Sequence, residues 1–329
     1  MEPQCSPPPA TTIDAAKQVR ASIVVCSHCV CVPLDRCLAG MRGEVDRPED
    51  LVFVANGRQD QVAEWVRDRF PDITIVELPE NRYYCGGYNA GIRWAMDQGH
   101  DYVLLVNGDT EVASPGFLRR LIDFAEHDRR AAFVGPRVFY RSRDEVQRTA
   151  LRYPSFWRHF WGWPAHRLLG ERPQIATPAE VEFLNGVCVL CRVTALRQIG
   201  LLDENMGGYA EDADWSWRAR RAGFTSLYVP EPSVIHHEQT HGYEHHSLKT
   251  FMLKRNTVYW LKKRGAPTEA LAYALCSLGL ALVRAGWAIP RRREASLHRG
   301  FVRRLARAYW GILSGRPIGD WYGPPVGSW

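Results

Sequence analysis

Two short stretches of the sequence carry carboxylates at spacings that suit metal binding and proton transfer. Asn107-Gly108-Asp109 follows an apolar run, and an Asp beside a Gly there suits a divalent cation that holds phosphate oxygens. Glu211-Asp212 opens the densest acidic cluster of the chain, and one carboxylate of such a cluster can remove the proton of a hydroxyl nucleophile. The simpler alternatives are a β-turn that caps a helix, and acidic residues that complement a helix N-terminus.

A histidine-rich stretch lies further along the chain. Residues 236–246 hold five of the eleven histidines. His236 follows an apolar run and a turn at 230–232, and its imidazole is suited to complete a metal site begun by Asp109. A purely structural role for these histidines is the alternative.

A glycine-rich loop follows the third apolar run, and residues 81–91 read NRYYCGGYNAG. We place Gly86-Gly87 at the start of a helix, where free backbone N–H groups favour anions and the small residues let a nucleotide come close. The loop lacks the Gly-Lys-Ser/Thr of a Walker loop and the GxGxxG spacing. A plain tight turn is the alternative.

Alternating apolar runs and amphipathic stretches must position these groups. Strands are predicted at 21–26, 51–55, 73–78, 102–106, 131–138, 181–192 and 224–229, and helices at 33–42, 59–70, 87–98, 115–127, 211–222, 248–264, 268–289 and 294–313. Repeated strand–helix units predict an α/β fold with a mostly parallel sheet that is covered by helices on both faces. Ligands of such sheets bind beyond the carboxyl ends of the strands, where the segments 26–28, 55–57, 81–89 and 107–109 should converge.

A Cys-x-x-Cys pair within one predicted strand resembles a zinc knuckle. Residues three apart in a strand point to opposite faces of the sheet, so Cys188 and Cys191 cannot share one metal ion. We interpret both as buried structural thiols.

Composition and charge limit the class of protein. The 329 residues are 46% hydrophobic and 24% charged, which excludes a collagen-like or wholly disordered chain, and nine Cys are too few for a disulfide scaffold. The first twenty residues are polar and Pro-rich, without an apolar leader, and no charge-free stretch reaches about 18 residues. These features predict a cytoplasmic protein.

The net charge of +6 is unevenly distributed. Residues 249–310 carry a net charge of +12, whereas residues 1–248 carry −6. A basic C-terminal segment of this kind suits an anionic lipid surface or another polyanion.

Taken together, these motifs resemble family-2 glycosyltransferases (GT2) of the GT-A fold, in their bacterial rhamnosyltransferase-like branch. The resemblance covers about residues 21–264 and is most specific in FLNGVCVLCRVTALRQIGLLDENMGGYAEDADWSWRARRAG, residues 183–223. The loop at 81–91 fits the family's N-x-G-x-G-G-x-N-x-G, residues 102–110 fit D-Y-hhhLN-x-D-T, and residues 234–237 fit V-h-H. The order and spacing of the four matches carry the resemblance.

The resemblance implies inverting, metal-dependent transfer of a sugar from a nucleotide sugar to a hydroxyl acceptor. It implies that Asp212, beside Glu211, is the catalytic base, and that Asp109 and His236 bind Mg²⁺ or Mn²⁺ against the diphosphate. The implied nucleotide-sugar-binding residues are Asn56, Asn81, Gly87, Asn89, Asn107, Gly108, Asp109 and Arg255. The implied acceptor-side residues are Gly186, Tyr209 and Trp215.

The sequence departs from the family pattern at two strand ends. The first strand ends in Cys26-Ser27-His28, where Thr-Tyr/Phe-Asn is usual, and the second ends in Ala55, where an Asp commonly contacts the nucleobase. The donor base is therefore left open among dTDP, UDP and GDP. Alternative functions are a nucleotidyltransferase with a similar sheet and a non-catalytic, glycosyltransferase-like binding subunit.

The expected organisation has three parts. Residues 1–20 form a flexible tail, residues 21–264 form the GT-A domain with a nucleotide-binding half (21–130) and an acceptor half (131–264), and residues 265–329 form a basic amphipathic helical extension. The expected acceptor is a polysaccharide, a lipid-linked glycan or a natural product, and no nucleic-acid partner is expected. The helices at 266–313 are candidates for peripheral contact with the inner face of the membrane, for packing on the body or for a homodimer.

Overall fold

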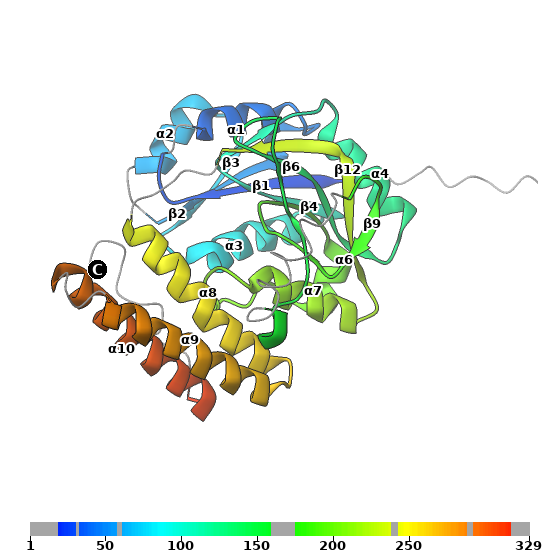
Figure 1. Ribbon diagram of the computed structural model, residues 1–329. Coiled ribbons are helices and arrows are strands. Elements are labelled where there is room, and N and C mark those ends of the chain that lie inside the picture. Colours follow the sequence, from blue (N-terminus) through cyan, green and yellow to red (C-terminus); the bar gives the residue numbers. More distant parts are fainter. Residues whose placement is uncertain are drawn as a thin grey trace, which may run out of the picture.

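A computed structural model describes residues 19–30, 33–57, 61–158, 175–237, 243–287 and 292–316. Most of the expected N-terminal tail, the aromatic residues at 160–163 and His241 lie outside the described residues. Figure 1 shows an α/β body with a curled sheet, and a group of three helices from the C-terminal part beside it.

The first half of the sheet is parallel. It contains β1 (Ala21–Ser27), β2 (Leu51–Asn56), β3 (Thr74–Leu78) and β4 (Tyr102–Asn107), in the order β3-β2-β1-β4. The connections contain α1 (Leu34–Arg42), the 3₁₀ turn Pro48–Asp50, α2 (Val62–Arg69) and α3 (Tyr83–Asp97), and α4 (Phe117–His127) follows. Every residue of β2 is buried, as expected for strands covered on both faces.

The two faces of the sheet pack against different helices. Val24 of β1 packs with the helix α3, whereas Ile23 and Val25 point to the other face and pack with α1, α2 and α4. Cys191 belongs to the first of these cores and Cys188 to the second, which confirms that the two thiols lie on opposite faces.

The second half of the sheet is mixed. β6 (Ala131–Tyr140) pairs parallel with β12 (Thr225–His236), and β11 (Cys188–Arg192) runs antiparallel between β4 and β6. Short strands complete it: β5 (Thr110–Val112), β7 (Val146–Gln147) and β9 (Ala179–Val181), with β8 (Ala150–Leu151) and β10 (Phe183–Leu184) as a separate pair. The prediction of a mostly parallel sheet flanked by helices is confirmed.

Some predicted elements differ from the structure. The single strand expected over 181–192 is wrong, because Asn185 accepts the Val187 N–H and turns the chain between β10 and β11. The strand expected over 224–229 does not end at the proline pair, since β12 continues through an irregularity between Val229 and Ser233 to His236. The sequence analysis missed β5 and the short helix α6 (Val193–Ile199).

The start of α3 was also predicted wrongly. The helix begins at Tyr83, so Gly86 and Gly87 lie in its second turn rather than at its N-terminus. Polar side chains explain the earlier start: Asn56 accepts the Arg82 N–H, and Asn81 accepts the Tyr83 N–H. Two backbone donors that the sequence analysis left free for an anion are therefore satisfied by side chains.

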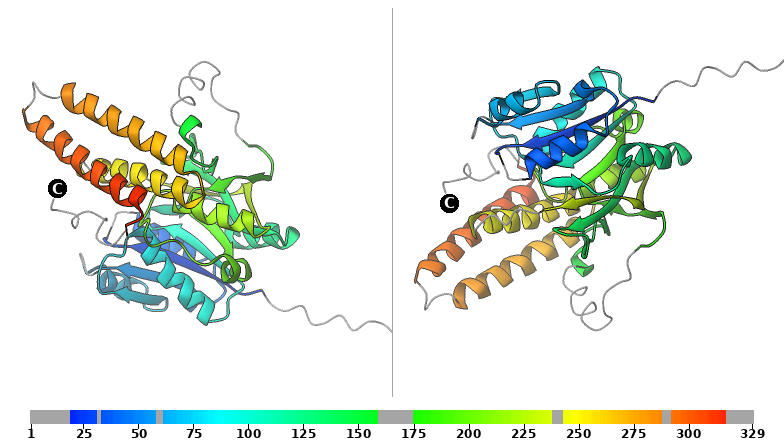
Figure 2. Two further views of the ribbon diagram at one scale, coloured as in Figure 1. Left: turned by 90° about the horizontal axis from the view of Figure 1, so that it is seen from below. Right: turned by 90° about the horizontal axis from the view of Figure 1, so that it is seen from above.

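The C-terminal helices form a layer on one side of the body. They are α8 (Tyr243–Lys263), α9 (Pro267–Trp287) and α10 (Arg292–Ser314), whereas α7 (Glu211–Arg221) lies within the body. Figures 1 and 2 show α8 against the α/β body and α9 beside α10 at the outside. The prediction of a C-terminal helical part is confirmed.

Candidate active site

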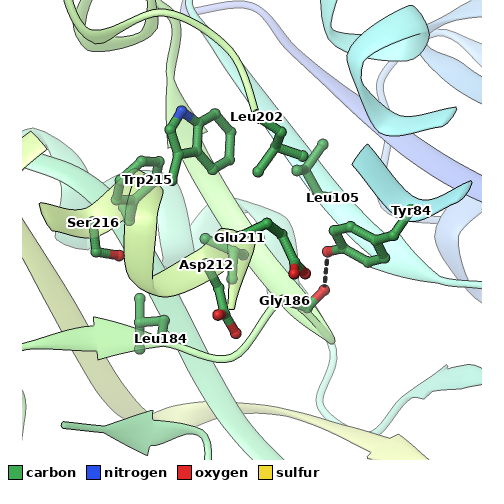
Figure 3. A pocket seen from close by; sticks show the side chains of 11 residues that line it. Tyr84, Leu105, Leu184, Gly186, Leu202, Glu211, Asp212, Trp215 and Ser216 are labelled. Carbon is green, nitrogen blue, oxygen red and sulfur yellow. Dashed lines mark hydrogen bonds between the residues drawn. The ribbon is translucent and has the colours of Figure 1, made fainter. Parts of the chain in front are cut away.

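The acidic pair lies at the first turn of α7, after a strained turn. Tyr209 and Ala210 both adopt left-handed backbone conformations, with φ of 66° and 70°. Such conformations cost on the order of 1 kcal/mol for residues other than glycine, so surrounding contacts must hold them. After this turn, the Glu211 carboxylate points toward Tyr84 and Gly186, and Asp212 lies beside it (Figure 3).

Two neighbouring side chains of α8 hold that turn. The buried amide of Asn256 donates to the carbonyl oxygens of Met206, Gly208 and Tyr209, at 2.6–2.8 Å. Arg255, also buried, donates to the Asn205 carbonyl at 2.7 Å and to the Asn256 side chain at 2.6 Å. Arg255 therefore holds the segment before the acidic pair from inside the protein.

A small enclosed cavity of about 20 Å³ adjoins the acidic pair, which is room for about one water molecule. It is lined by Tyr84, Leu105, Phe133, Leu184, Gly186, Val189, Leu202, Glu211, Asp212, Trp215 and Ser216 (Figure 3). Trp215 is buried there, its ring 4.7 Å from that of Phe133, and its indole N–H donates to the Gly200 carbonyl at 2.8 Å. The walls are mostly apolar, and Glu211 is buried among them whereas Asp212 is half-buried.

The apolar surroundings raise the pKa of both acids. Desolvation raises the pKa of Asp212 to about 6, although backbone N–H groups of Ala213 and Gly186 oppose the shift. Desolvation, and then the charge of Asp212, raises the pKa of Glu211 well above its usual range. Burial thus favours the protonated form of both acids, and more strongly for Glu211 than for Asp212.

A side chain at Gly186 would displace that of Tyr84. A Cβ there would be 2.4 Å from the Tyr84 hydroxyl oxygen, and that hydroxyl donates to the Gly186 carbonyl at 2.6 Å. Next in the chain, Val187 accepts the Asn107 N–H at 3.0 Å. Gly186 and Val187 therefore connect the acidic pair to the loop that carries Asp109.

The structure brings Asp109 and His236 together. β5 pairs antiparallel with β12, and this register sets His236 opposite Thr110, the residue after Asp109. His236 Nε2 lies 3.2 Å from Asp109 Oδ1, and His236 Nδ1 lies 2.8 Å from Gln147 Oε1. The pair is formed by the strand β5 that the sequence analysis did not predict.

This pair fits a divalent cation as a partial ligand set. A carboxylate oxygen and an imidazole nitrogen suit Mn²⁺ and Mg²⁺, and two adjacent ligands of an octahedral ion about 2.1 Å away lie about 3 Å apart. Among the described residues no group of three or more His, Cys, Asp or Glu side chains could hold a metal. The protein would supply two ligands and leave the other positions to phosphate and water.

Of the nucleotide-side residues predicted from the sequence, five lie together, whereas Asn89 lies elsewhere. Asn56, Asn81 and Gly87 meet at the start of α3, where a Cβ on Gly87 would be 2.8 Å from Asn56 Nδ2. Asn107 and Gly108 end β4 beside them, and Asn107 Oδ1 accepts the Tyr88 hydroxyl at 3.2 Å. These five residues line the carboxyl ends of β2 and β4.

Asn89 does not join that group. Its side chain is buried and bonds to both the N–H and the carbonyl of Leu202, at 3.0 and 2.9 Å, and to Glu204 at 3.0 Å. Glu204 also pairs with Arg82 and Arg93. Asn89 thus ties α3 to the segment that leads into the acidic pair.

An open groove of about 370 Å³ lies on the acceptor half, lined by Tyr153, Ser155, Trp157, Arg158, Glu182, Arg220, Arg264 and Glu269. Its charged residues pair across it, Arg158 with Glu182 at 2.8 Å and Arg264 with Glu269 at 2.6 Å. Trp157 is exposed beside them. An exposed indole among charged groups is suited to stack on a sugar ring.

Sequence reasoning missed three residues that support the site: Tyr84, Gln147 and Asn256. Tyr84 lies inside the glycine-rich loop, and Asn256 follows Arg255 directly, so both were within quoted motifs. Gln147 lies in a two-residue strand with no periodicity to mark it. Only the pairing of that strand with β6 brings Gln147 to His236.

Comparison with known proteins identifies relatives. An N-acetylglucosaminyl-diphospho-decaprenol L-rhamnosyltransferase of Mycobacterium tuberculosis is 29% identical over 298 residues, covering 81% of this chain and 94% of the relative. The low-salt glycan biosynthesis hexosyltransferase Agl10 of Haloferax volcanii is 25% identical over 190 residues, covering 57% of this chain and 59% of the relative.

Solved structures share the fold. The mannosyltransferase PcManGT from Pyrobaculum calidifontis, in complex with GDP-Man and Mn²⁺, has a TM-score of 0.52 at 15% identity, covering 91% of this chain and 88% of that one. GalNAc-T7 with UDP, GalNAc and Mn²⁺ also has a TM-score of 0.52, at 14% identity over 75% of this chain. This chain spans about half, 48%, of GalNAc-T7.

The model of the protein family described as glycosyltransferase-like family 2 matches residues 20–257. These residues include every candidate site residue. This match decides against the nucleotidyltransferase considered above and for a sugar-transferring enzyme. The chain is a glycosyltransferase of the GT-A fold and belongs to the glycosyltransferase-like family 2.

Proposed function

We propose that the enzyme transfers a sugar from a nucleoside-diphosphate donor to an acceptor hydroxyl in one displacement, with Asp212 as the base. The observation that carries the proposal is a half-buried carboxylate at the start of α7 whose pKa desolvation raises to about 6. A base with this pKa is ionised at neutral pH and still basic enough to take a hydroxyl proton as the new bond forms. A single in-line attack inverts the anomeric configuration.

Glu211 supports the base without sharing its charge. Its pKa is raised well above the usual range, so it is protonated while Asp212 is ionised. A protonated neighbour does not compete for the acceptor proton. We assign the base to Asp212 alone, and to Glu211 the role of a neutral neighbour.

We assign a divalent cation, Mg²⁺ or Mn²⁺, to Asp109 and His236. Two proteins of similar fold were solved with Mn²⁺, and the 3.2 Å separation of the two side chains fits adjacent ligands of one ion. When bound, the cation neutralises the charge that gathers on the leaving diphosphate. Asn107 and Gly108, at the end of β4, would border the diphosphate.

The nucleoside would lie at the carboxyl end of β2, bordered by Asn56, Asn81 and Gly87. Asn89 and Arg255 act on this subsite indirectly, because their polar groups hold the segment 202–206. We propose that the donor sugar is L-rhamnosyl, the sugar named for the mycobacterial relative. The base of the donor is left to experiment, because Ala55 stands where a base-contacting Asp is usual.

We propose that the acceptor is a sugar linked through diphosphate to a polyprenol, as in the name of the mycobacterial relative. The open groove with Trp157, Arg158 and Arg220 has an aromatic surface for a sugar and cations for a diphosphate. Gly186 and Trp215 line the small cavity beside Asp212, and Tyr209 lies in the turn that precedes it. Such an acceptor assigns the enzyme to the cytoplasmic face of a membrane.

A nucleotide panel tests the donor side. We expect one of UDP, GDP, dTDP, CDP and ADP to raise the melting temperature by about 5 °C with Mn²⁺ present, and EDTA to abolish the shift. The matching nucleotide-L-rhamnose should then label a short-chain N-acetylglucosaminyl-diphospho-lipid. No shift with any nucleotide, together with no transfer, would leave a non-catalytic binding subunit as the better account.

A further inference from the structure

The helix α9 has an unusual distribution of side chains. Its buried face consists of small residues with one tyrosine, namely Ala270, Tyr273, Ala274, Ser277, Ala281 and Ala285. Five of its six large aliphatic residues point outward: Leu271, Leu275, Leu280, Leu282 and Val283 are 48–62% exposed, whereas Leu278 is partly buried. From Leu271 to Val283 the outward face carries no Asp, Glu, Lys or Arg.

This distribution is reversed relative to a helix that packs in water. A helix on the surface of a globular protein buries its leucines and exposes its polar residues. Small residues between helices with leucines facing outward are typical of helices whose outer face meets lipid. On the inner face of α9, the Ser277 hydroxyl hydrogen-bonds to the Tyr309 hydroxyl of α10 at 2.8 Å.

The neighbouring helix α10 carries a basic row. Arg299, Arg303 and Arg307 are exposed at successive intervals of four residues, so they lie along one face, and Trp310 continues the row at 65% exposure. Trp is enriched at the boundary between hydrocarbon and headgroups, and Arg pairs with lipid phosphate. α9 and α10 lie side by side outside α8, so the two helices form one outer layer (Figure 2).

We propose that this outer layer, the leucine face of α9 with the arginine row of α10, docks on the surface of an anionic phospholipid bilayer. The charge of the row identifies the occupant, because a second copy of the same face would bring like charges together. This proposal rests on the proposed function in one respect: it names the surface that brings the enzyme to a lipid-linked acceptor.

The docking is parallel to the membrane rather than across it. By length and composition, Pro267–Gly286 is the one helix among the described residues that could span a bilayer. It is, however, packed on α8 and α10, and spanning would take the arginine row of α10 into the hydrocarbon. A helix with one packed face and one apolar face lies in the interface.

The placement suits the acceptor side. Glu269, in the first turn of α9, and Arg264, just before it, both line the open groove beside Trp157. The leucine face starts at Leu271, two residues further on. A lipid surface against α9 would therefore lie next to the groove to which we assign the acceptor headgroup.

Vesicle sedimentation of the full chain tests the proposal. We expect binding to vesicles of phosphatidylcholine with about one third phosphatidylglycerol, and much weaker binding to phosphatidylcholine alone. Arg299→Gln with Arg303→Gln and Arg307→Gln should weaken binding on the order of 100-fold, from the attraction of about three cations. Leu275→Ser with Leu282→Ser should weaken it at least about tenfold, from the lost burial of two leucines.

Matched controls remove the same charge and apolar surface elsewhere. Arg36→Gln with Arg119→Gln and Arg130→Gln changes three exposed arginines of the α/β body, and Val30→Ser with Leu253→Ser changes two exposed apolar residues outside α9. Both controls should bind vesicles like the wild type. Equal loss in test and control variants would overturn the proposal, as would a wild type that ignores anionic vesicles.

Two further results identify other occupants and would also overturn it. A lipid-free dimer that dissociates on Leu275→Ser with Leu282→Ser, without vesicle binding, would assign the face to a second copy. Protein that resists carbonate extraction from membranes would assign α9 to a spanning helix. Transfer to a short-chain, water-soluble acceptor separates this proposal from the function: vesicle binding without transfer overturns only the function, and transfer without vesicle binding overturns only the docking face.

Discussion

The side-chain amide of Asn256 donates a hydrogen bond of 2.8 Å to the carbonyl oxygen of Tyr209, two residues before the acidic pair. The same amide also bonds to Met206 and Gly208, so one side chain of α8 holds three carbonyls of one turn. Tyr209 and Ala210 adopt conformations that they would leave without such support. The orientation of Glu211 and Asp212 thus depends on a helix that lies outside the sheet.

Replacing Asn256 tests this dependence. Asn256→Ala should destabilise the fold by about 3 kcal/mol, because buried carbonyls lose their donors, and should lower kcat at least tenfold with a smaller effect on KM. Urea unfolding and steady-state kinetics measure the two effects. Thr257→Val, at the next buried position of α8, removes a hydrogen bond to the Leu253 carbonyl and should affect stability but not kcat. A folded Asn256→Ala enzyme with wild-type kcat would contradict the role.

Asp212→Asn tests the catalytic base. We expect kcat to fall about 10³-fold, because the amide cannot accept the acceptor proton, while nucleoside diphosphate still raises the melting temperature as in the wild type. Glu211→Gln is the matched control, since a neutral amide replaces a carboxyl that is already protonated. It should keep kcat within about tenfold. If the two variants lose activity equally, the assignment of the base to Asp212 fails.

The pKa of Asp212 predicts a pH dependence. Since the base must be ionised and its pKa is about 6, kcat/KM should fall about tenfold per pH unit below pH 6 and level off above it. Asp212→Asn should abolish this fall of kcat/KM below pH 6 in the activity that remains. If kcat/KM instead begins to fall near pH 4, the Asp212 carboxylate is not desolvated during turnover.

The raised pKa of Asp212 affects stability in the opposite direction to activity: activity rises with pH, whereas stability falls. A carboxyl whose pKa rises on folding binds its proton more tightly in the folded state, so its contribution is greatest below its unfolded pKa and is lost as pH rises through about 6. Asp212→Asn should therefore raise the free energy of unfolding at pH 7, by about 1–3 kcal/mol, and have little effect at pH 4. Urea unfolding at the two pH values measures the difference.

Much of the fold could be predicted because its strands are short apolar runs buried on both faces. Leu51–Asn56 and Tyr102–Asn107 are examples, and their carboxyl ends locate Asn56 and Asp109 at the same edge of the sheet. The parts that were missed are those whose formation depends on distant partners. β5 has only three residues and exists through its pairing with the end of β12.

The candidate site was likewise predicted only in part from the sequence. The motif spacing singled out Asp109, Asp212 and His236, but it could not tell how a polar side chain is used. The resemblance implied that Arg255 binds the nucleotide sugar, whereas its burial and its bond to the Asn205 carbonyl give it a supporting role. That information lies in the packing of α8 on the segment before α7.

Asp109 and His236 predict metal-dependent binding of the donor. Asp109→Ala and His236→Ala should each abolish the part of the nucleoside diphosphate shift in melting temperature that requires Mn²⁺, because each removes one of two protein ligands. His237→Ala is the control, since the neighbouring imidazole bonds to Glu111 instead, at 3.0 Å. Shifts that EDTA and both variants leave unchanged would exclude a metal at this pair.

Gln147 provides a finer test of the same pair. His236 Nδ1 lies 2.8 Å from Gln147 Oε1, and a ring that donates from Nδ1 keeps the lone pair of Nε2 directed toward Asp109 and a cation. Gln147→Leu removes the acceptor at nearly constant volume, and should weaken Mn²⁺ about 10- to 100-fold in titrations of the nucleotide-bound enzyme. Gln147→Glu keeps an acceptor and should restore most of the affinity. A Gln147→Leu enzyme with unchanged Mn²⁺ affinity would mean that the orientation of His236 is set by the β5–β12 pairing alone.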